Sequence, residues 1–166
     1  MLVLTHSLRE LRFGELMAVY IDSIAEAASD WPDLPPGLAC QLAEQDVYQY
    51  LKDVFFPTQG AVCALWEEKG KYVSALRLEP YKDGLLLEAL ETAPNQRKKG
   101  YAVSLIQAVQ AYLAEQGLVK LYSHVNKRNI ASLKTHEKCG FSVVSDHAVY
   151  INGSVDYRCC TLLYEA

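Results

Sequence analysis

Residues 85–117 constrain the fold more than any other part of the chain. A short apolar run, Leu85–Thr92, lies between a glycine and a proline, as is typical of a buried strand. After three basic residues, apolar side chains recur at helical spacing over 102–113, and the pattern stops at a glycine. The sequence therefore predicts a strand, a loop and a helix that begins at or near Gly100.

The start of this helix is a candidate anion site. Backbone N–H groups of a first helical turn have no partner inside the helix, and the positive end of the helix dipole lies beside them, so they bind phosphate oxygens. Arg97, Lys98 and Lys99 precede the turn, where cations oppose the dipole and need an anion to balance them. The two common phosphate loops, G-x-G-x-x-G and G-x-x-x-x-G-K-[ST], are both absent. A phosphorylated ligand bound by another kind of loop is expected.

Two short motifs narrow the choice of ligand. Residues 97–102 spell Arg-x-x-Gly-x-Ala, and residues 129–132 (Asn-Ile-Ala-Ser) lead into residues 136–141 (His-Glu-Lys-Cys-Gly-Phe). The first resembles the pyrophosphate-binding motif of the GNAT superfamily of acyl-CoA N-acyltransferases. The second resembles that family's Asn-x-x-(Ala/Ser) … Tyr-Glu-Lys-x-Gly-Phe segment, and the order and separation of the two also agree. The resemblance covers about residues 85 to 141.

This resemblance implies acetyl-CoA as co-substrate and no metal. The coenzyme-binding residues that it implies are Leu90, Thr92, Arg97, Lys98, Lys99, Gly100, Tyr101, Ala102 and Asn129. Gly100, which lacks a Cβ, would let the pyrophosphate approach the backbone. Backbone amides around Leu90 and Thr92 would align the pantetheine and polarise the thioester carbonyl. Asn129 also suits the N-cap of the next helix, because asparagine is a preferred residue there.

The carboxylates of the apolar strand are candidates for proton transfer. Glu88 and Glu91 lie in a run that is otherwise suited to burial, where a carboxylate is costly unless it is paired or functional. Two-residue periodicity predicts that they lie on opposite faces of the strand. Because members of the family often carry their base on this strand, Glu88 is expected to take the proton of an amine, directly or through water, with Glu91 in reserve. Alternatively, the carboxylate faces solvent or pairs with Arg77.

The second motif departs from the family pattern at His136, which stands where the family has its general-acid tyrosine. An imidazolium with a reference pKa of ~6.5 can protonate a thiolate whose conjugate acid has a pKa of ~8.5, provided that the ring is charged. We therefore predict that His136 protonates the departing CoA thiolate or that water does so, with Tyr101 and Tyr122 as substitutes. A histidine near a helix C-terminus with no catalytic role would look the same.

The remaining patterns predict a single N-acetyltransferase domain over residues 1–166. Ser7 and Glu10 form a capping box that predicts a helix start. A second helix over 38–56, strands over 61–67, 72–79 and 118–125, a helix over 129–139 and a hairpin over 141–164 with an Asn152-Gly153 type I′ turn complete the chain. The order β-α-α-β-β-β-α-β-α-β-β matches the GNAT fold, an α/β (α+β) class with a mixed, mostly antiparallel central sheet.

Composition bears on partners and location. No apolar window approaches the ~18 to 20 residues of a membrane span, and the first residues lack the basic start of a secretory signal. The expectation is a cytoplasmic protein without membrane or nucleic-acid partners. Five cysteines without C-x-x-C spacing indicate reduced thiols rather than disulfides or a zinc site.

Charge is unevenly divided along the chain. Residues 1–60 hold nine acidic and three basic side chains, a net charge of −6, and residues 61–166 hold 11 and 13, a net charge of +2. In this fold the first two helices usually wall the acceptor side, so they would concentrate a cationic amine, although they equally suit two solvated helix faces.

The sequence thus predicts transfer of an acetyl group from acetyl-CoA to a primary amine by direct attack. The alternative is a non-catalytic acyl-CoA-binding or sensing module. A Rossmann nucleotide-binding domain is disfavoured by the missing glycines. The sequence predicts a small-molecule or peptide amine as acceptor but does not identify it. Whether the chain forms a homodimer is also left open.

Overall fold

One seven-stranded sheet organises the molecule, in the order β1-β2-β3-β4-β5-β9-β6. In the computed structural model, which describes residues 1–166, neighbouring strands are antiparallel except β4 and β5, which are parallel. The strands are β1 (Leu2–Thr5), β2 (Val62–Glu68), β3 (Lys71–Tyr81), β4 (Gly84–Thr92), β5 (Lys120–Asn126), β6 (Ser142–Ser145) and β9 (Cys159–Glu165), with β7 (Ala148–Val149) and β8 (Val155–Asp156) as a separate ribbon. The predicted mixed, mostly antiparallel sheet is confirmed.

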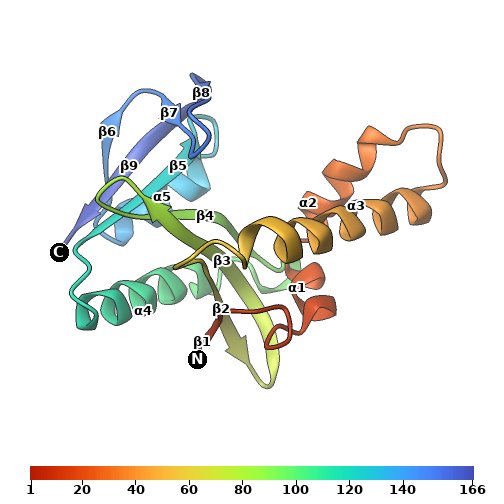
Figure 1. Ribbon diagram of the computed structural model, residues 1–166, viewed down its shortest axis with the longest axis horizontal. Helices are drawn as coiled ribbons and strands as arrows, with labels where there is room; N and C mark the ends of the chain where they lie inside the picture. Colours follow the sequence, from red (N-terminus) through yellow and green to blue (C-terminus); the bar gives the residue numbers. More distant parts are fainter.

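Helices cover both faces of this sheet. The helices are α1 (Phe13–Val19), α2 (Ile21–Ala27), α3 (Pro36–Tyr50), α4 (Tyr101–Glu115) and α5 (Ile130–Lys138), with 3₁₀ turns η1 (Ala28–Asp30) and η3 (Pro94–Gln96) and the π-helical turn η2 (Leu51–Phe55). Figure 1 shows α4 lying along one side of the sheet, and α2 and α3 projecting from the other as an arm.

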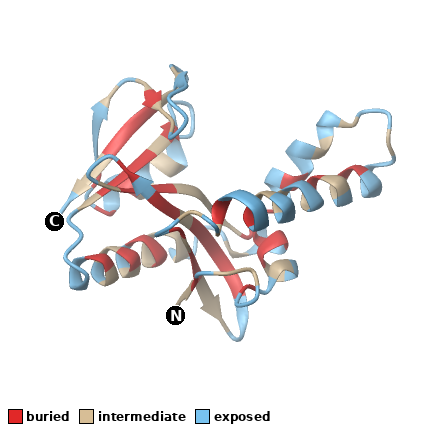
Figure 2. Cartoon of the chain, viewed as in Figure 1, coloured by how far each residue is buried: buried red, intermediate tan, exposed pale blue.

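Two apolar cores follow from the alternation of side chains along β3. Leu76 and Leu78 belong to the core under α4, which includes Leu105 and Ile106 of that helix. Ala75 belongs instead to the core formed with α1, α2 and α3. Buried stripes on the inner sides of the helices and along the central strands mark the two layers in Figure 2. The sheet therefore has an α4 face and an α1–α3 face, and these names are kept below.

The first helix begins at Phe13, so the predicted start at Ser7 was wrong. Glu10 does accept a hydrogen bond from a backbone N–H, that of His6 at 2.7 Å, but Glu10 N–H and Leu11 N–H donate to carbonyls three residues earlier and form only turns. The capping box thus stabilises a turn instead of a helix end. At Tyr20 the chain breaks between α1 and α2.

The predicted type I′ turn at the C-terminal hairpin was also wrong. Gly153 has a φ of 84°, but Asn152 has no positive φ, which a type I′ turn requires at both central residues. Gly153 N–H donates to Tyr150 O and Tyr150 N–H donates to Ser154 O, so the connection is a three-residue loop. It joins the short strands β7 and β8 and leaves β6 paired directly with β9.

The five cysteines are free thiols, as the sequence indicates. None of the helices has the length and apolar character that crossing a membrane requires.

Candidate functional site

The candidate site lies where β4 and β5 stop pairing. Their register runs only from Leu85–Leu121 to Leu87–Ser123, although both strands continue beyond it. A cavity of about 190 Å³ lies between the unpaired ends, and one of about 750 Å³ continues from it to the start of α4. The two cavities share Leu90, Asn129 and Ser132 as lining residues. Since they meet at these residues, we describe them together as one cleft at the carboxyl ends of two interior strands of the sheet.

A β-bulge shapes the β4 side of this cleft. Between the register pairs Arg77–Glu88 and Ala75–Glu91, β4 uses one residue more than β3. Ala89, inside the bulge, has a φ of 52°, which is uncommon for a residue with a side chain. Its carbonyl accepts a hydrogen bond of 2.7 Å from the hydroxyl of Tyr20. Tyr20 lies at the break between α1 and α2, so this break positions the side chain that stabilises the bulge.

The bulge overturns the prediction that Glu88 and Glu91 lie on opposite faces. Because one extra residue interrupts the two-residue alternation, both carboxylates lie on the α1–α3 face: Glu88 faces Arg77, and Glu91 accepts a hydrogen bond from Ser23 of α2. Two carboxyl groups from one strand therefore line successive parts of the same cleft.

The start of α4 provides unpaired backbone donors, as predicted. Lys98 and Gly100 both have positive φ, 62° and 83°, and the helix begins at Tyr101. The first helical bond of the loop is Ser104 N–H to Gly100 O, so the N–H groups of residues 101–103 have no acceptor in the chain. All three residues line the larger cavity, together with Gly100. This arrangement can bind an anion.

Gly100 is required here by backbone conformation. A Cβ at this position would meet no atom within 4 Å, so space does not exclude a side chain. The φ of 83° does, because residues with a Cβ rarely adopt it. The open space above the glycine also leaves room for a ligand to approach the backbone, which was the predicted role.

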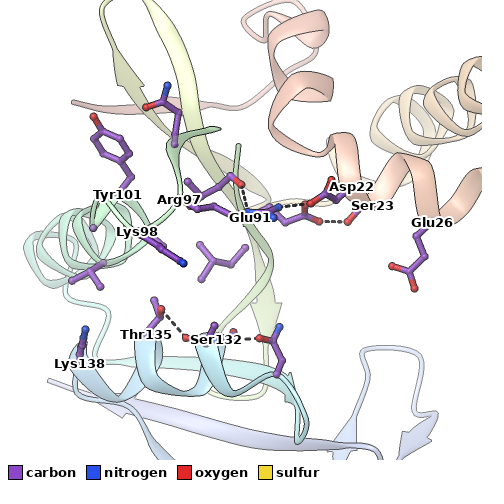
Figure 3. A pocket seen from close by; sticks show the side chains of 18 residues that line it. Asp22, Ser23, Glu26, Glu91, Arg97, Lys98, Tyr101, Ser132, Thr135 and Lys138 are labelled. Carbon is purple, nitrogen blue, oxygen red and sulfur yellow. Dashed lines mark hydrogen bonds and ion pairs between the residues drawn. The ribbon is translucent and has the colours of Figure 1, made fainter. Parts of the chain in front are cut away.

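The three cations of the loop have different surroundings. Arg97 donates through Nε to Thr92 O at 3.1 Å and through its terminal nitrogen to Asp22 of α2 at 2.7 Å. Lys99 donates to the side chain of Gln96 at 2.9 Å and does not line the cavity. Figure 3 shows Lys98 pointing into the cavity. Of the three, Lys98 is therefore the cation best placed for an anionic ligand, and Arg97 links α2 to the end of β4.

The opposite wall of the cleft comes from α5. Asn129 is its N-cap, with a side-chain oxygen that accepts from Ser132 N–H at 3.1 Å, so the structural alternative predicted for this residue is present. It lines both cavities as well, and its amide nitrogen has no partner in the chain. Lys138, at the other end of the helix, brings a second cation to the larger cavity. Thr135 lines the wall between them.

Glu88 lines the smaller cavity and has an altered acidity. Burial is the main cause that raises the pKa of its carboxyl to about 8, a hydrogen bond with Glu79 raises it further, and Arg77 opposes the rise. Glu88 Oε1 lies 3.9 Å from Arg77 Nε, which is longer than a hydrogen bond, and both atoms are buried without a partner. The alternative of a pair with Arg77 is thus present only as a long ion pair.

Glu91 lies at the junction with α2. Burial raises the pKa of its carboxyl, and the bond from Ser23 partly offsets that rise. Asp22, Ser23 and Glu26 of α2 line the larger cavity beside it. This part of the cleft is acidic on the α2 side and basic on the side of Lys98 and the α5 lysine.

His136 is held in a neutral form. It is 1% exposed, with Nδ1 2.8 Å from Ser132 O and Nε2 2.8 Å from the hydroxyl of Ser123. Since a carbonyl can only accept, Nδ1 carries the proton and Nε2 accepts from Ser123. Burial lowers the pKa of the ring. The carboxylate neighbour that would favour an imidazolium is absent, although His136 does line the smaller cavity.

The two substitute tyrosines lie in different places. Tyr101 lines the larger cavity at the start of α4. Tyr122 donates its hydroxyl to Asp83 at 2.6 Å and lines neither cavity.

Sequence reasoning missed His124 and Ser123 of β5. His124 lies edge-on between the rings of Tyr81 and Tyr150, with centroids 5.4 and 5.3 Å away, and its Nε2 is buried without a partner. Both residues line the smaller cavity. Alternation along residues 120–126 could have placed them on opposite faces, but only the register with β4 shows that His124 shares a face with Glu88.

Comparisons with known proteins agree with this architecture. A family model described as the acetyltransferase (GNAT) family matches residues 19–141. An L-methionine sulfoximine/L-methionine sulfone acetyltransferase from Pseudomonas aeruginosa is 27% identical over 130 residues, which cover 77% of this chain and 73% of that protein.

Two solved structures show the same fold. The ribosomal-protein-S18-alanine N-acetyltransferase of Escherichia coli aligns with a TM-score of 0.63 and 15% identity, covering 99% of this chain and 94% of that one. A Bacillus subtilis acetyltransferase in complex with CoA aligns with a TM-score of 0.56 and 15% identity, covering 74% and 83%. At this identity the likeness concerns the fold alone.

Proposed function

Since the chain belongs to the GNAT acetyltransferase family, and is therefore an acyltransferase, we propose that it transfers an acetyl group from acetyl-CoA to a primary amine that attacks the thioester directly. The observation that carries the proposal is the continuity of the cleft. An anion-binding helix start at one end is joined, at Leu90, Asn129 and Ser132, to a cavity with a raised-pKa carboxyl at the other.

The larger cavity suits the phosphates of the coenzyme. The unpaired N–H groups of residues 101–103 and the side chain of Lys98 supply donors and positive charge, and Lys138 adds a cation from the other wall. Between the two cavities, β4 has no strand partner beyond Leu87 on its β5 side. Thr92 O accepts from Arg97, but the backbone N–H groups near Leu90 and Thr92 remain available to hold the pantetheine and to polarise the thioester carbonyl.

Glu88 is the proposed proton acceptor. The ammonium of a primary amine has a pKa of ~10, and a base is most effective when its own pKa lies near the working pH. A carboxyl with a pKa of about 8 meets that condition. It is protonated and inactive below this value and ionised above it, so kcat/KM should rise with pH through about 8.

His136 is the proposed acid for the departing thiolate, with water as the alternative. The thiolate needs a proton from Nε2, but Nε2 of the neutral ring accepts from Ser123 and has none to give. The ring must first gain a proton, and the lowered pKa restricts this to mildly acidic solution. His136 can therefore act only where the pH is low, and water must supply the proton where Glu88 is ionised.

The acceptor is proposed to be cationic. Asp22, Glu26 and Glu91 line the larger cavity on the α2 side and would attract an ammonium group. The Pseudomonas relative is named for two amino-acid derivatives, so small amino-acid amines belong in the test beside polyamines, aminoglycosides and lysine peptides.

The proposal is tested by thiol release from acetyl-CoA with that amine panel, with calorimetric titration of acetyl-CoA alone as a second readout. We expect binding, and acetyl transfer to at least one amine. Replacing the base, Glu88→Gln, should lower kcat/KM at pH 8.5 by about 10² to 10³-fold and leave acetyl-CoA affinity unchanged. Glu137→Gln, an exposed carboxylate on α5, is the matched control.

Tight coenzyme binding with no turnover on any amine would contradict the proposal and favour a binding or sensing module. A wild-type rate in Glu88→Gln would move the proton transfer to Glu91 or to water. A preference for anionic acceptors would rule out the cationic class.

A further inference from the structure

Two charged side chains of β3 surround Glu88 on the α1–α3 face. Arg77 is its register partner, and Glu79, two residues further along β3, is its diagonal neighbour on the same face. Long side chains at such diagonal positions reach one another. Glu79 is only 7% exposed and lies close enough to Glu88 for one carboxyl group to hydrogen-bond the other. Two carboxyl groups therefore share a mostly buried site.

The guanidinium of Arg77 is held by aromatic rings. It lies over Tyr50 of α3 and Phe55 of η2, with its Cζ 5.1 and 5.6 Å from the ring centroids. The π-helical turn η2 supplies Phe55, which is fully buried. Arg77 is thus fixed by packing at 3.9 Å from Glu88, where it attracts the carboxylate without a direct hydrogen bond.

We propose that Arg77 and Glu79 are positioning residues for Glu88 and together set the pH above which Glu88 accepts the proton of an amine. This inference rests on the proposed function, in which Glu88 takes that proton. Two adjacent carboxyl groups resist double ionisation, so Glu79 keeps the proton on Glu88. The cation of Arg77 favours its release. Burial makes the largest contribution to the raised pKa of Glu88, and the opposing effects of Glu79 and Arg77 adjust it, so that the carboxyl exchanges protons in mildly alkaline solution, where a free glutamic acid would stay ionised.

The other titratable groups near Glu88 change no charge over this range. The hydroxyls of Tyr20, at the α1–α2 junction, and Tyr50, on α3, both have a pKa raised mainly by burial and stay neutral. His124 faces the same cavity from β5, and burial lowers its pKa, so it is neutral when Glu88 ionises. Arg77 and Glu79 are therefore the charged groups that shift the pKa of Glu88.

The test compares pH profiles of kcat/KM, and carbon NMR titrations of the glutamate carboxyl groups, in two test variants and one control, with a fourth variant for signal assignment. Glu79→Gln should move the acidic limb of the profile to lower pH by about one unit or more, since a neighbouring like charge is removed. Arg77→Met keeps the apolar stem under the rings and should move it to higher pH by about one unit. The matched control Glu137→Gln changes the net charge equally and should leave the limb in place. Glu88→Gln assigns the NMR signal.

Opposite shifts in the two variants support the inference, and an unmoved limb in Glu79→Gln or shifts of equal sign overturn it. Circular dichroism and Tm identify a variant that does not fold, and Arg77→Gln, which also removes the charge, then replaces Arg77→Met. The NMR titration needs no turnover. If no amine is acetylated and the Glu88 signal still shifts as expected, the proposed function fails while the charged cluster stands.

Discussion

The two ends of the cleft are built differently. The proposed anion-binding end comes mainly from one continuous stretch, residues 90–103, with Lys138 of α5 on the other wall, and depends on backbone conformation. The proton-transfer end joins Arg77 and Glu88 with His124 of β5 and with rings of α3 and η2, and it depends on strand register. A substitution in the contiguous end can therefore leave the other end in place. A substitution in the end that depends on strand register should also affect the helices and strands packed against it. Three experiments with substituted proteins test this contrast.

The largest effect is expected from Gly100→Glu. The substitution forces a side chain into a φ of 83° and places a carboxylate beside the proposed phosphates. Like charges brought together cost several kcal/mol, so acetyl-CoA should bind about 10²-fold or more weakly in calorimetric titration. The acidic limb of the kcat/KM profile should stay where it is. A moved limb would show that the two ends are not independent.

His136→Phe should act on turnover in a manner that depends on pH. If the imidazolium is the acid, kcat should fall about 10²-fold in acidic solution, where the ring is charged, and only a few-fold near pH 8.5, because burial lowers the pKa of the ring and leaves it neutral there. His136→Tyr restores a hydroxyl acid and should retain much of the activity. Equal, small losses at both pH values would assign His136 a packing role and leave the thiolate to water.

The smallest effect is expected when two neighbouring lysines are substituted separately and their effects on acetyl-CoA binding are compared. Lys98 lines the cavity, whereas Lys99 binds Gln96 outside it. Lys98→Gln should weaken acetyl-CoA binding about tenfold, the loss of one charge-assisted contact, and Lys99→Gln by less than about threefold. Similar losses in both would mean that general charge, and no particular contact, attracts the coenzyme; the salt dependence of each Kd checks this.

Local patterns predicted most of the anion-binding end. The predicted helix start near Gly100 was correct within a residue, because an apolar stripe and a glycine with positive φ are readable from neighbours in sequence. The sequence could not predict which of the three cations faces the cavity. Arg97 instead donates a hydrogen bond to Asp22, which lies on a helix 75 residues earlier in the chain.

The proton-transfer end could not be predicted in the same way. Alternation placed Glu88 and Glu91 on opposite faces, and a bulge held by Tyr20, 69 residues away, put them on one. The capping box at Ser7 failed for a similar reason: Arg12, just before α1, bonds to Glu67 and to the hydroxyl of Tyr72, so contacts with the β2–β3 hairpin fix where that helix begins. Long-range pairing overrode a correct local rule in both cases.

Only three residue pairs join β4 to β5, whereas seven join β5 to β9. The edge strand β6 is also held by three pairs, but among the interior strands from β2 to β9 the β4–β5 line has the fewest, so opening of the interior of the sheet should begin between those two strands. That line leads into the proposed reaction centre. If the two substrates bind where we propose, the same interruption of pairing also makes opening for product release easier, and the rate of release should depend on the three backbone pairs that join β4 to β5.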